Sequence, residues 1–450
     1  MKGKLLFVFT FLSFMVSFGQ SFPGYSSDNY NGSYGLISNP ANIADSRIKM
    51  DINLISGNFL GSTDYISLTQ KNIGAFLKGF EFENDVVRKV TNQNEILANE
   101  DFVGPSFMYA MDDVNSVGLF TRIRKFRNYN GINGQAFETI LGNSSVGDYI
   151  FSIDNSDTSV HMWGEVGFSY ARVLLDEGNH FFKVGTTLKL LVGAGSAQSQ
   201  SESVTGTYNA GEGRLDFQGD ISYVTTFENE APNFNIKNLG TGGAFDVGFV
   251  YEFRPDAARS MAAYQGERER NKYKFRIGVS LLDYGEVTYK EQGQTVYTEL
   301  DGSILIEDFA NGNLDEILRT NFESNGITRE GKLTVALPTS LHINIDYKAY
   351  RDIYLNVEYN QTMVEKTDLY NNNRINHLTI TPRYERRNLA AFLPISFSPL
   401  GGTSMGAGLR LGPIILGSGS VLSNLILKEP KSINFFMGVR IITHHVGRRR

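Results

Sequence analysis

Hydrophobic and polar residues alternate along much of the chain. From residue 353 to residue 359 the alternating positions are Ile353, Leu355, Val357 and Tyr359 on one side and Tyr354, Asn356 and Glu358 on the other. Successive side chains of a β-strand point to opposite faces, so this segment predicts a strand with one apolar and one polar face. The same pattern recurs at Leu341–Tyr347, Phe182–Val192, Phe245–Phe253, Phe275–Leu281 and Ile433–Ile441.

This pattern is typical of a transmembrane β-barrel, whose strands cross the bilayer in about 9–11 residues and alternate between lipid and lumen. A soluble β-sandwich also alternates and is the competing interpretation. We predict an all-β, antiparallel transmembrane barrel of about fourteen strands, within a range of about twelve to sixteen. The expected strands lie near residues 49–69, 102–111, 115–126, 161–175, 180–194, 241–254, 272–284, 332–347, 351–363, 374–385, 389–399, 402–411, 413–420 and 432–443.

The lengths of the connections favour the barrel over the sandwich. Short turns at Met111–Asn115, Asp176–Asn179, Lys348–Tyr350 and Glu385–Asn388 alternate with long polar connections near 127–160, 194–240 and 285–331. Outer-membrane barrels place short turns in the periplasm and long loops outside the cell. Within the connections, short helices are expected in residues 71–99 and 255–270, and the run Ser303–Leu318 is expected to belong to the largest outer loop.

The N-terminus predicts export. Lys2 and Lys4 precede the apolar run Leu5–Phe18, and Ser17 and Gly19 supply the small residues of a cleavage site, so residues 1–19 are expected to be a signal peptide. The segment 20–47 is rich in Gly, Ser, Asn and Tyr and lacks alternation. It either folds into the lumen as a plug or simply leads into the first strand. Residues 48–443 are then the barrel, and residues 444–450 a basic periplasmic tail.

Composition and charge exclude several kinds of function. The net charge of -6 supplies no basic field for nucleic acid, and the absence of cysteine excludes disulfides, thiolate metal sites and a lipid-modified N-terminal cysteine. His444 and His445 are adjacent, so on a strand they would point to opposite faces and could not easily share a metal. We therefore expect no metal and no cofactor.

Catalytic and nucleotide-binding motifs are not supported either. His342, Asn344 and Asp346 share a face, but they point to the predicted lumen, whereas catalysis on a barrel wall would need Ser, His and an orienting group on the lipid side. The glycine pairs 401–402, 406–408 and 417–419 do not lead from a strand into a helix, as a nucleotide-binding loop would. We expect no enzyme.

The alternation places a set of charged residues in the lumen. They are Arg122, Arg124, Lys183, Lys189, Lys274, Arg276, Arg410 and Arg440, with Asp246, Glu252, Asp346 and Glu358. Basic groups outnumber acids in this set. Either these side chains fill a structural lumen with salt bridges, or they line a conduit that favours anionic or amphipathic solutes, because rings of Arg and Lys select anions.

Several short motifs resemble an uncharacterised family of Bacteroidota outer-membrane barrels. They are Asn39-Pro40-Ala41, Tyr65–Leu68, Leu337–His342 and Gly408–Ile415. The resemblance spans nearly the whole chain after the signal peptide. That family is distantly similar to barrels of the PorP/SprF type, associated with type IX secretion and gliding, and to the FadL/PorV type. The resemblance implies an outer-membrane barrel in contact with lipid, and it supplies no catalytic or binding residues.

Two functions remain open. The first is a structural or accessory scaffold for an envelope, secretion or motility assembly, in which other envelope proteins would be partners. The alternative is a channel or transporter for small anionic or hydrophobic solutes. A filled lumen favours the scaffold, and a continuous lumen or a lateral gap between strands favours transport.

Overall fold

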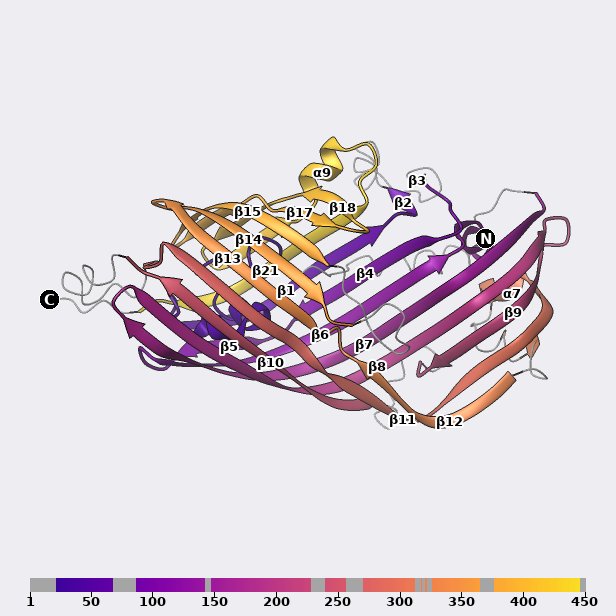
Figure 1. Cartoon of the computed structure of the whole chain (residues 1–450), viewed down its shortest axis with the longest axis horizontal. Coiled ribbons are helices and arrows are strands. Elements are labelled where there is room, and N and C mark those ends of the chain that lie inside the picture. The colour runs from indigo at the N-terminus through magenta and orange to yellow at the C-terminus, as the bar shows by residue number, and fades with distance from the viewer. Residues whose placement is uncertain are drawn as a thin grey trace.

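The computed structural model describes residues 22–67, 86–141, 147–227, 239–255, 270–311, 317, 320–321, 326–364 and 376–445. They form a closed antiparallel barrel of 14 strands, elongated along its axis (Figure 1). The predicted signal peptide, residues 1–19, lies outside the described residues. No helix among the described residues is both long enough and apolar enough to cross a membrane.

Several strands of the barrel are built from two shorter pieces that share one path. In chain order the strands are β1 (Met50–Thr63), β4 (Asn94–Val103) with β5 (Ser106–Ala110), β6 (Asn115–Ile132), β7 (Tyr149–Glu177), β8 (His180–Asn209), β9 (Arg214–Thr225) with β10 (Gly240–Phe253), β11 (Phe275–Leu305), β12 (Gly326–Ala336) with β13 (Ser340–Tyr350), β14 (Ile353–Thr362), β15 (His377–Arg386), β16 (Leu389–Phe392) with β17 (Ile395–Ser398), β18 (Gly402–Met405) with β19 (Ala407–Leu411), β20 (Ile414–Ser418) and β21 (Ser432–Thr443). Proline lies in three of the breaks, at Pro105, Pro338 and Pro394, because it cannot donate a hydrogen bond to the ladder.

The barrel closes where its first and last strands meet. β1 pairs with β21 from Met50↔Thr443 to Ile55↔Val439, and on its other side β1 pairs with β4 and β5. A small second sheet of β2 (Ile66–Ser67) and β3 (Val87–Arg88) lies apart from the wall. The helices are short: α2 (Tyr34–Ser38), the 3-10 helix η1 (Pro40–Ile43), α5 (Gly134–Ile140), α7 (Ile306–Asn311) and α9 (Val421–Ile426).

Each predicted strand overlaps an observed one in the described part of the chain, but the connections differ from expectation. The predicted outer connections 127–160, 194–240 and 285–331 contain much strand, because β7, β8 and β11 are 29, 30 and 31 residues long and β9 is an additional piece. The β7–β8 hairpin stays paired out to Tyr149↔Tyr208. These extensions are rich in Ser, Thr and Gln on both faces, so they carry no alternation that a sequence pattern could detect.

The expected loop helices have mixed outcomes. The run Ser303–Leu318, predicted only as part of the largest outer loop, contains the short helix α7. Of the expected helix 71–99, residues 71–85 lie outside the described part of the chain, and Asn94–Asn99 belong to strand β4, so a helix there is wrong. Of the expected helix 255–270, residues 256–269 also lie outside the described part.

Alternation divides the wall into a lipid-facing and a luminal side. On β8, Leu188 and Leu190 are 65% and 73% exposed, whereas their neighbours Thr187 and Lys189 are buried. The outward apolar residues of the neighbouring strands form a belt that suits the hydrocarbon core of a bilayer.

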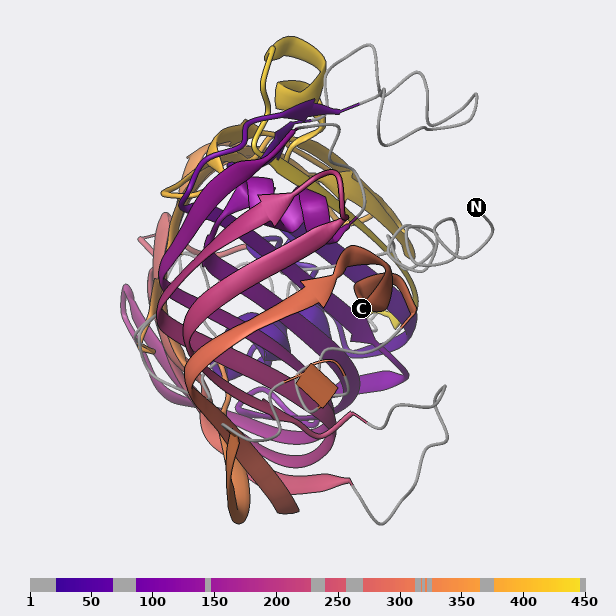
Figure 2. The same cartoon turned by 90° about the vertical axis from the view of Figure 1, so that its right-hand side faces the viewer.

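Residues Phe22–Ile48, here called the luminal segment, lie inside the barrel (Figure 2). Its first half packs Phe22, Tyr25 and Tyr34 against Phe392 and Phe436 of the wall. Its second half belongs to a buried cluster of Leu36, Ile43, Ile48, Met108 and Phe120. Apolar burial on both halves fixes the segment in the lumen.

Candidate functional site in the barrel lumen

The turn Asn39–Ala41 docks the luminal segment on the wall. The Asn39 side chain caps η1 by accepting a hydrogen bond from Ala41 N at 2.9 Å. Its amide group donates to the carbonyl oxygens of Phe249 and Val279, at 3.2 and 3.3 Å. A Cβ added at Gly185 of β8 would lie 2.6 Å from Pro40 O, so the close approach requires glycine there.

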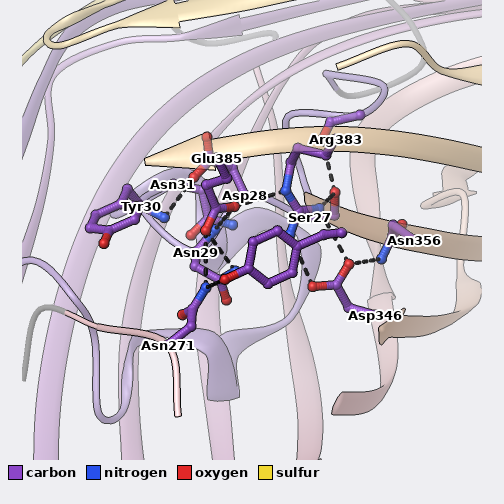
Figure 3. A network of polar contacts seen from close by, with 12 residues as sticks. Ser27, Asp28, Asn29, Tyr30, Asn31, Asn271, Asp346, Asn356, Arg383 and Glu385 are labelled. Atoms are coloured by element: carbon purple, nitrogen blue, oxygen red, sulfur yellow. Dashed lines mark hydrogen bonds and ion pairs between the residues drawn. The ribbon is translucent and has the colours of Figure 1, made fainter. Parts of the chain in front are cut away.

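A polar network holds the first half of the luminal segment (Figure 3). Arg383 of β15 contacts Asp346 at 2.9 Å and Glu385 at 2.8 Å, and it donates to Ser27 Oγ at 2.6 Å. Asn29 donates to Glu385 through both its backbone N–H and its side chain, at 3.1 and 2.9 Å. Wall ion pairs and segment hydrogen bonds therefore share the same buried carboxylates.

Two further ion pairs join the luminal segment to the wall near each of its ends. Arg410 Nε of β19 lies 2.7 Å from Asp28 Oδ2. Arg254, which follows β10, contacts Asp45 at 2.7 Å. Burial alone would raise the pKa of Asp45, but Arg47 and Arg254 outweigh it and hold that pKa well below its ordinary range. Asp45 is therefore a carboxylate at neutral pH.

Beyond the luminal segment lies a charged layer, defined as Asp101, Arg122, Arg124, Glu165, Lys189, Asp246 and Asp283. Lys189 contacts Asp246 at 2.7 Å and Asp283 at 2.6 Å. Arg124 contacts Asp283 at 2.9 Å, and because β6 and β11 are separated in the sheet by β7, β8 and β10, this ion pair joins strands that are not neighbours in the wall. Arg122 binds Asp101 and Glu165.

The charged layer coincides with an irregularity in β11. Asp283 has a left-handed backbone, with φ of 60°, and its backbone N–H donates to Asp246 at 2.7 Å. At this point β11 changes its partner from β13, which ends its pairing at Leu282↔Ser340, to β12, which begins at Glu286↔Ala336. A bulge of this kind turns the side chain of the bulged residue toward the lumen.

An apolar cluster continues the lumen beyond the charged layer. The luminal apolar cluster consists of Phe126, Trp163, Leu191, Val224, Val287, Tyr289, Leu333, Val335 and Leu337, all buried. The Arg124 guanidinium lies 4.8 Å from the centre of the Trp163 ring and so joins the two regions. The side-chain polar groups within the cluster are the Tyr289 hydroxyl, which lies 3.1 Å from His161 Nε2, and the Trp163 indole N–H, which donates to Glu165 Oε2 at 3.3 Å.

Glycines allow Tyr289 to lie against the wall. A Cβ at Gly240 of β10 would be 2.8 Å from Tyr289 Cε1, and one at Gly193 of β8 would be 2.6 Å from Tyr289 Cζ. Both contacts are shorter than side chains tolerate. Next to this place β9 ends at Thr225 and β10 begins at Gly240.

Eleven of the twelve charged residues expected in the lumen are buried there. Lys274 is the exception: it is half-buried, donates to Lys348 O at 2.8 Å and lies over the outward-facing Tyr347 ring. The alternation does not reach Lys274, because β11 begins at Phe275. The expectation that Lys274 faces the lumen is wrong.

The expected excess of basic groups in the lumen is also wrong. Among the described residues, the buried charges are ten Lys or Arg and eleven Asp or Glu. Sequence reasoning missed Asp101, Glu165, Arg383 and Glu385, which the continuing alternation of predicted strands could have found. It also missed Asp28 and Asp45, which lie in the luminal segment, and Asp283, which lies at a bulge. Side chains do not alternate between two faces at these places, so the sequence pattern could not locate them.

Similar solved structures span nearly the whole of each chain. They include a TodX monoaromatic hydrocarbon channel mutant (10% identity, 95% of this chain and 99% of that chain, TM-score 0.47). The Ralstonia pickettii toluene transporter TbuX is 12% identical over 96% and 100% of the two chains, with a TM-score of 0.44. A Pseudomonas aeruginosa FadL homologue is 10% identical over 94% and 96%, also with a TM-score of 0.44.

The sequence comparisons are of two kinds. No curated protein matches the sequence. Residues 40–419 match the model of a protein family, and this span is most of the chain. The chain therefore belongs to that family, described as a family of unknown function (DUF5723).

Proposed function

We propose that this protein is an outer-membrane channel or transporter for hydrophobic solutes, and that the luminal apolar cluster is where such solutes bind. The luminal apolar cluster itself carries the proposal. Inward positions of a water-filled barrel are polar, yet here β6, β7, β8, β11 and β12 all turn apolar or aromatic side chains inward at one level. Sites for apolar ligands are lined in this way, with few polar groups.

The rest of the lumen supports a solute-binding role rather than an open pore. The luminal segment and the charged layer lie between the cluster and the periplasmic turns, and their charges are paired within the protein. In the part of the chain that the structure describes, these paired charges form no ring of free cations of the kind that selects anions, so they do not favour an anion-selective conduit. An apolar solute gains by entering the cluster, whereas a hydrated ion would lose its water without compensation.

We also propose that the N-terminal signal exports the protein and that the barrel lies in the outer membrane, where its apolar belt contacts lipid. The filled lumen is a feature that a scaffold would share, but the inward-facing luminal apolar cluster favours a solute channel or transporter over it. The link to type IX secretion rests on the sequence resemblance alone. We assign no catalytic or cofactor role to any residue.

Uptake by whole cells tests the proposed function. Bacteria that produce the protein in their outer membrane are given radiolabelled naphthalene, and the initial uptake rate is compared with that of cells lacking the protein. Leu191→Gln places an amide in the cluster, whereas Leu190→Gln changes the adjacent lipid-facing side chain, which is 73% exposed. We expect the protein to raise uptake several-fold, Leu191→Gln to abolish most of that rise, and Leu190→Gln to keep it. Equal uptake with and without folded protein would refute the proposal.

A further inference from the structure

Helix α9 joins β20 to β21 and lies outside the ring of strands. In Figure 1 it projects from the wall above β17 and β18, and in Figure 2, along the barrel, it stands beyond the ring rather than over the opening. It contacts β18 and β21. The helix therefore occupies the side of the wall that the lipid-facing belt also occupies.

The polarity of α9 is inverted relative to a helix on a water-soluble protein. Its polar residues Ser423 and Asn424 are buried, at 4% and 7% exposure. Its apolar residues point away from the protein, with Ile426 72% and Leu425 43% exposed. A surface helix in water does the opposite and buries its apolar stripe.

Hydrogen bonds hold this orientation in place. Ser420, just before α9, is 1% exposed and its hydroxyl accepts from Asn434 N of β21 at 2.8 Å. Ser423 Oγ donates to Ser420 O at 2.7 Å, and Val421 N donates to Ser418 Oγ at 3.0 Å. The polar face is thus fixed to the wall, so the helix cannot turn to bury its leucines and isoleucine.

The exposed face of α9 continues the lipid-facing belt. β20, which leads into the helix, has Ile414 and Leu416 52% and 50% exposed, and β21, which follows it, has Phe435 42% exposed. Exposed Lys428 comes directly after Leu427, and exposed Lys431 follows it after exposed Glu429 and buried Pro430. Lysines at the edge of an apolar surface are placed to reach lipid headgroups while their stems stay near the hydrocarbon.

We propose that α9 is an interfacial membrane anchor, in which Val421, Leu425, Ile426 and Leu427 enter the outer leaflet and Lys428 and Lys431 meet its headgroups. The anchor fixes the depth of the β18–β21 side of the barrel. It acts independently of solute binding in the lumen.

The chain has no cysteine, so single labels can be placed cleanly. Ile426→Cys is labelled with a nitrobenzoxadiazole fluorophore in phosphatidylcholine–phosphatidylglycerol vesicles containing 5-doxyl or 12-doxyl phosphatidylcholine. Leu190→Cys in the belt is the membrane control, and Ala210→Cys, exposed after β8, is the water control. We expect 5-doxyl lipid to quench at position 426 at least half as strongly as at position 190, with 5-doxyl exceeding 12-doxyl there.

Two results would contradict the proposal that α9 is a membrane anchor. The first is quenching at position 426 no greater than at position 210, with full access to aqueous iodide. The second is emission that changes when unlabelled protein is added but not when doxyl lipid is added, which would place a second copy of the chain on the helix. Heat-modifiable mobility on gels confirms that each labelled variant is folded, and naphthalene uptake by the same variants reports separately on the lumen.

Discussion

Arg410 of β19 and Asp28 of the luminal segment form an ion pair from which water is excluded: Nε and Oδ2 are 2.7 Å apart and neither side chain is exposed. Arg410 also donates to the carbonyl oxygens of Arg387 and Arg386, at 2.8 and 2.9 Å. A charge buried in this way is tolerated only while its partner is present. The pair therefore joins the conformation of the luminal segment to that of the wall.

Removing one charge of this pair should weaken the protein. We expect Asp28→Asn to lower the free energy of unfolding by about 3–5 kcal/mol, because Arg410 is left buried and uncompensated. Urea titration in detergent micelles measures the change. Arg386→Gln is the matched control, since it breaks an ion pair of similar length with Asp352 in which the Arg386 side chain is 64% exposed. Equal losses in the two variants would contradict this account of the buried pair.

A second prediction concerns the glycines under the Asn39–Ala41 turn. A Cβ at Gly248 of β10 would collide with the Asn39 side chain, whereas a Cβ at Gly243 on the same strand would meet nothing closer than 3.7 Å. We expect Gly248→Ala to destabilise the docked turn by about 1–3 kcal/mol, as overpacking does, and Gly243→Ala to leave it docked. Hydrogen exchange of residues 34–44 provides the measurement. Similar protection in both variants would show that the turn does not need this close approach.

Alkaline pH should release the luminal segment. Burial raises the pKa of Tyr30 to about 12, and burial also raises the pKa values of Tyr25 and Tyr34. Because the folded values exceed the unfolded value of about 10, this stabilisation is complete below pH 10 and is lost as the pH rises through about 12.

Tyrosinate absorbance and limited proteolysis, followed together from pH 8 to pH 13, check the prediction. We expect ionisation of the buried tyrosines and cleavage of the segment to rise together, and Tyr30→Phe to move the release to higher pH. Tyr350→Phe, at an exposed turn, is the control. Cleavage that begins near pH 9, before these tyrosines ionise, would contradict it.

A fourth prediction concerns conduction. The luminal segment fills the barrel between β1 and the strands opposite, so the intact protein should show little ion current in planar bilayers. Deletion of residues 22–47 removes the apolar contacts and ion pairs that this segment makes with the wall. We expect the deletion variant to conduct several-fold more than the intact protein. Equal conductance, with both proteins folded by heat-modifiable mobility, would show that the segment does not block the lumen.

The sequence predicted the wall well because lipid and lumen impose opposite polarity on successive residues. Lys189 and Leu190, for example, lie on opposite faces of β8 as their alternation indicates. Outside the bilayer this constraint ends. The polar extensions of β7, β8 and β11 therefore show no alternation, and the sequence pattern predicted loops there. Lys274 was misplaced for a related reason, since it precedes the first paired residue of its strand.

The candidate site was harder to predict, because its residues break the alternation or lie outside it. Leu191 faces the lumen between two lipid-facing apolar residues, Leu190 and Val192, so three consecutive apolar positions replace the alternation there. That run was the available signal for an apolar lumen. The partners in the luminal segment, such as Asp28, follow no period, and only the folded chain brings them to residues hundreds of positions away.

Fluorescence of Trp163 tests the central claim most directly, because it is the one tryptophan of the chain and lies, fully buried, in the luminal apolar cluster. Bromobenzene, an apolar heavy-atom quencher, is titrated into the folded protein, and iodide serves as the charged control. The account predicts saturable quenching by bromobenzene that weakens at least several-fold in Leu191→Gln but not in Leu190→Gln, with no quenching by iodide. Quenching that rises linearly with bromobenzene and is the same in both variants would contradict a solute site in the lumen.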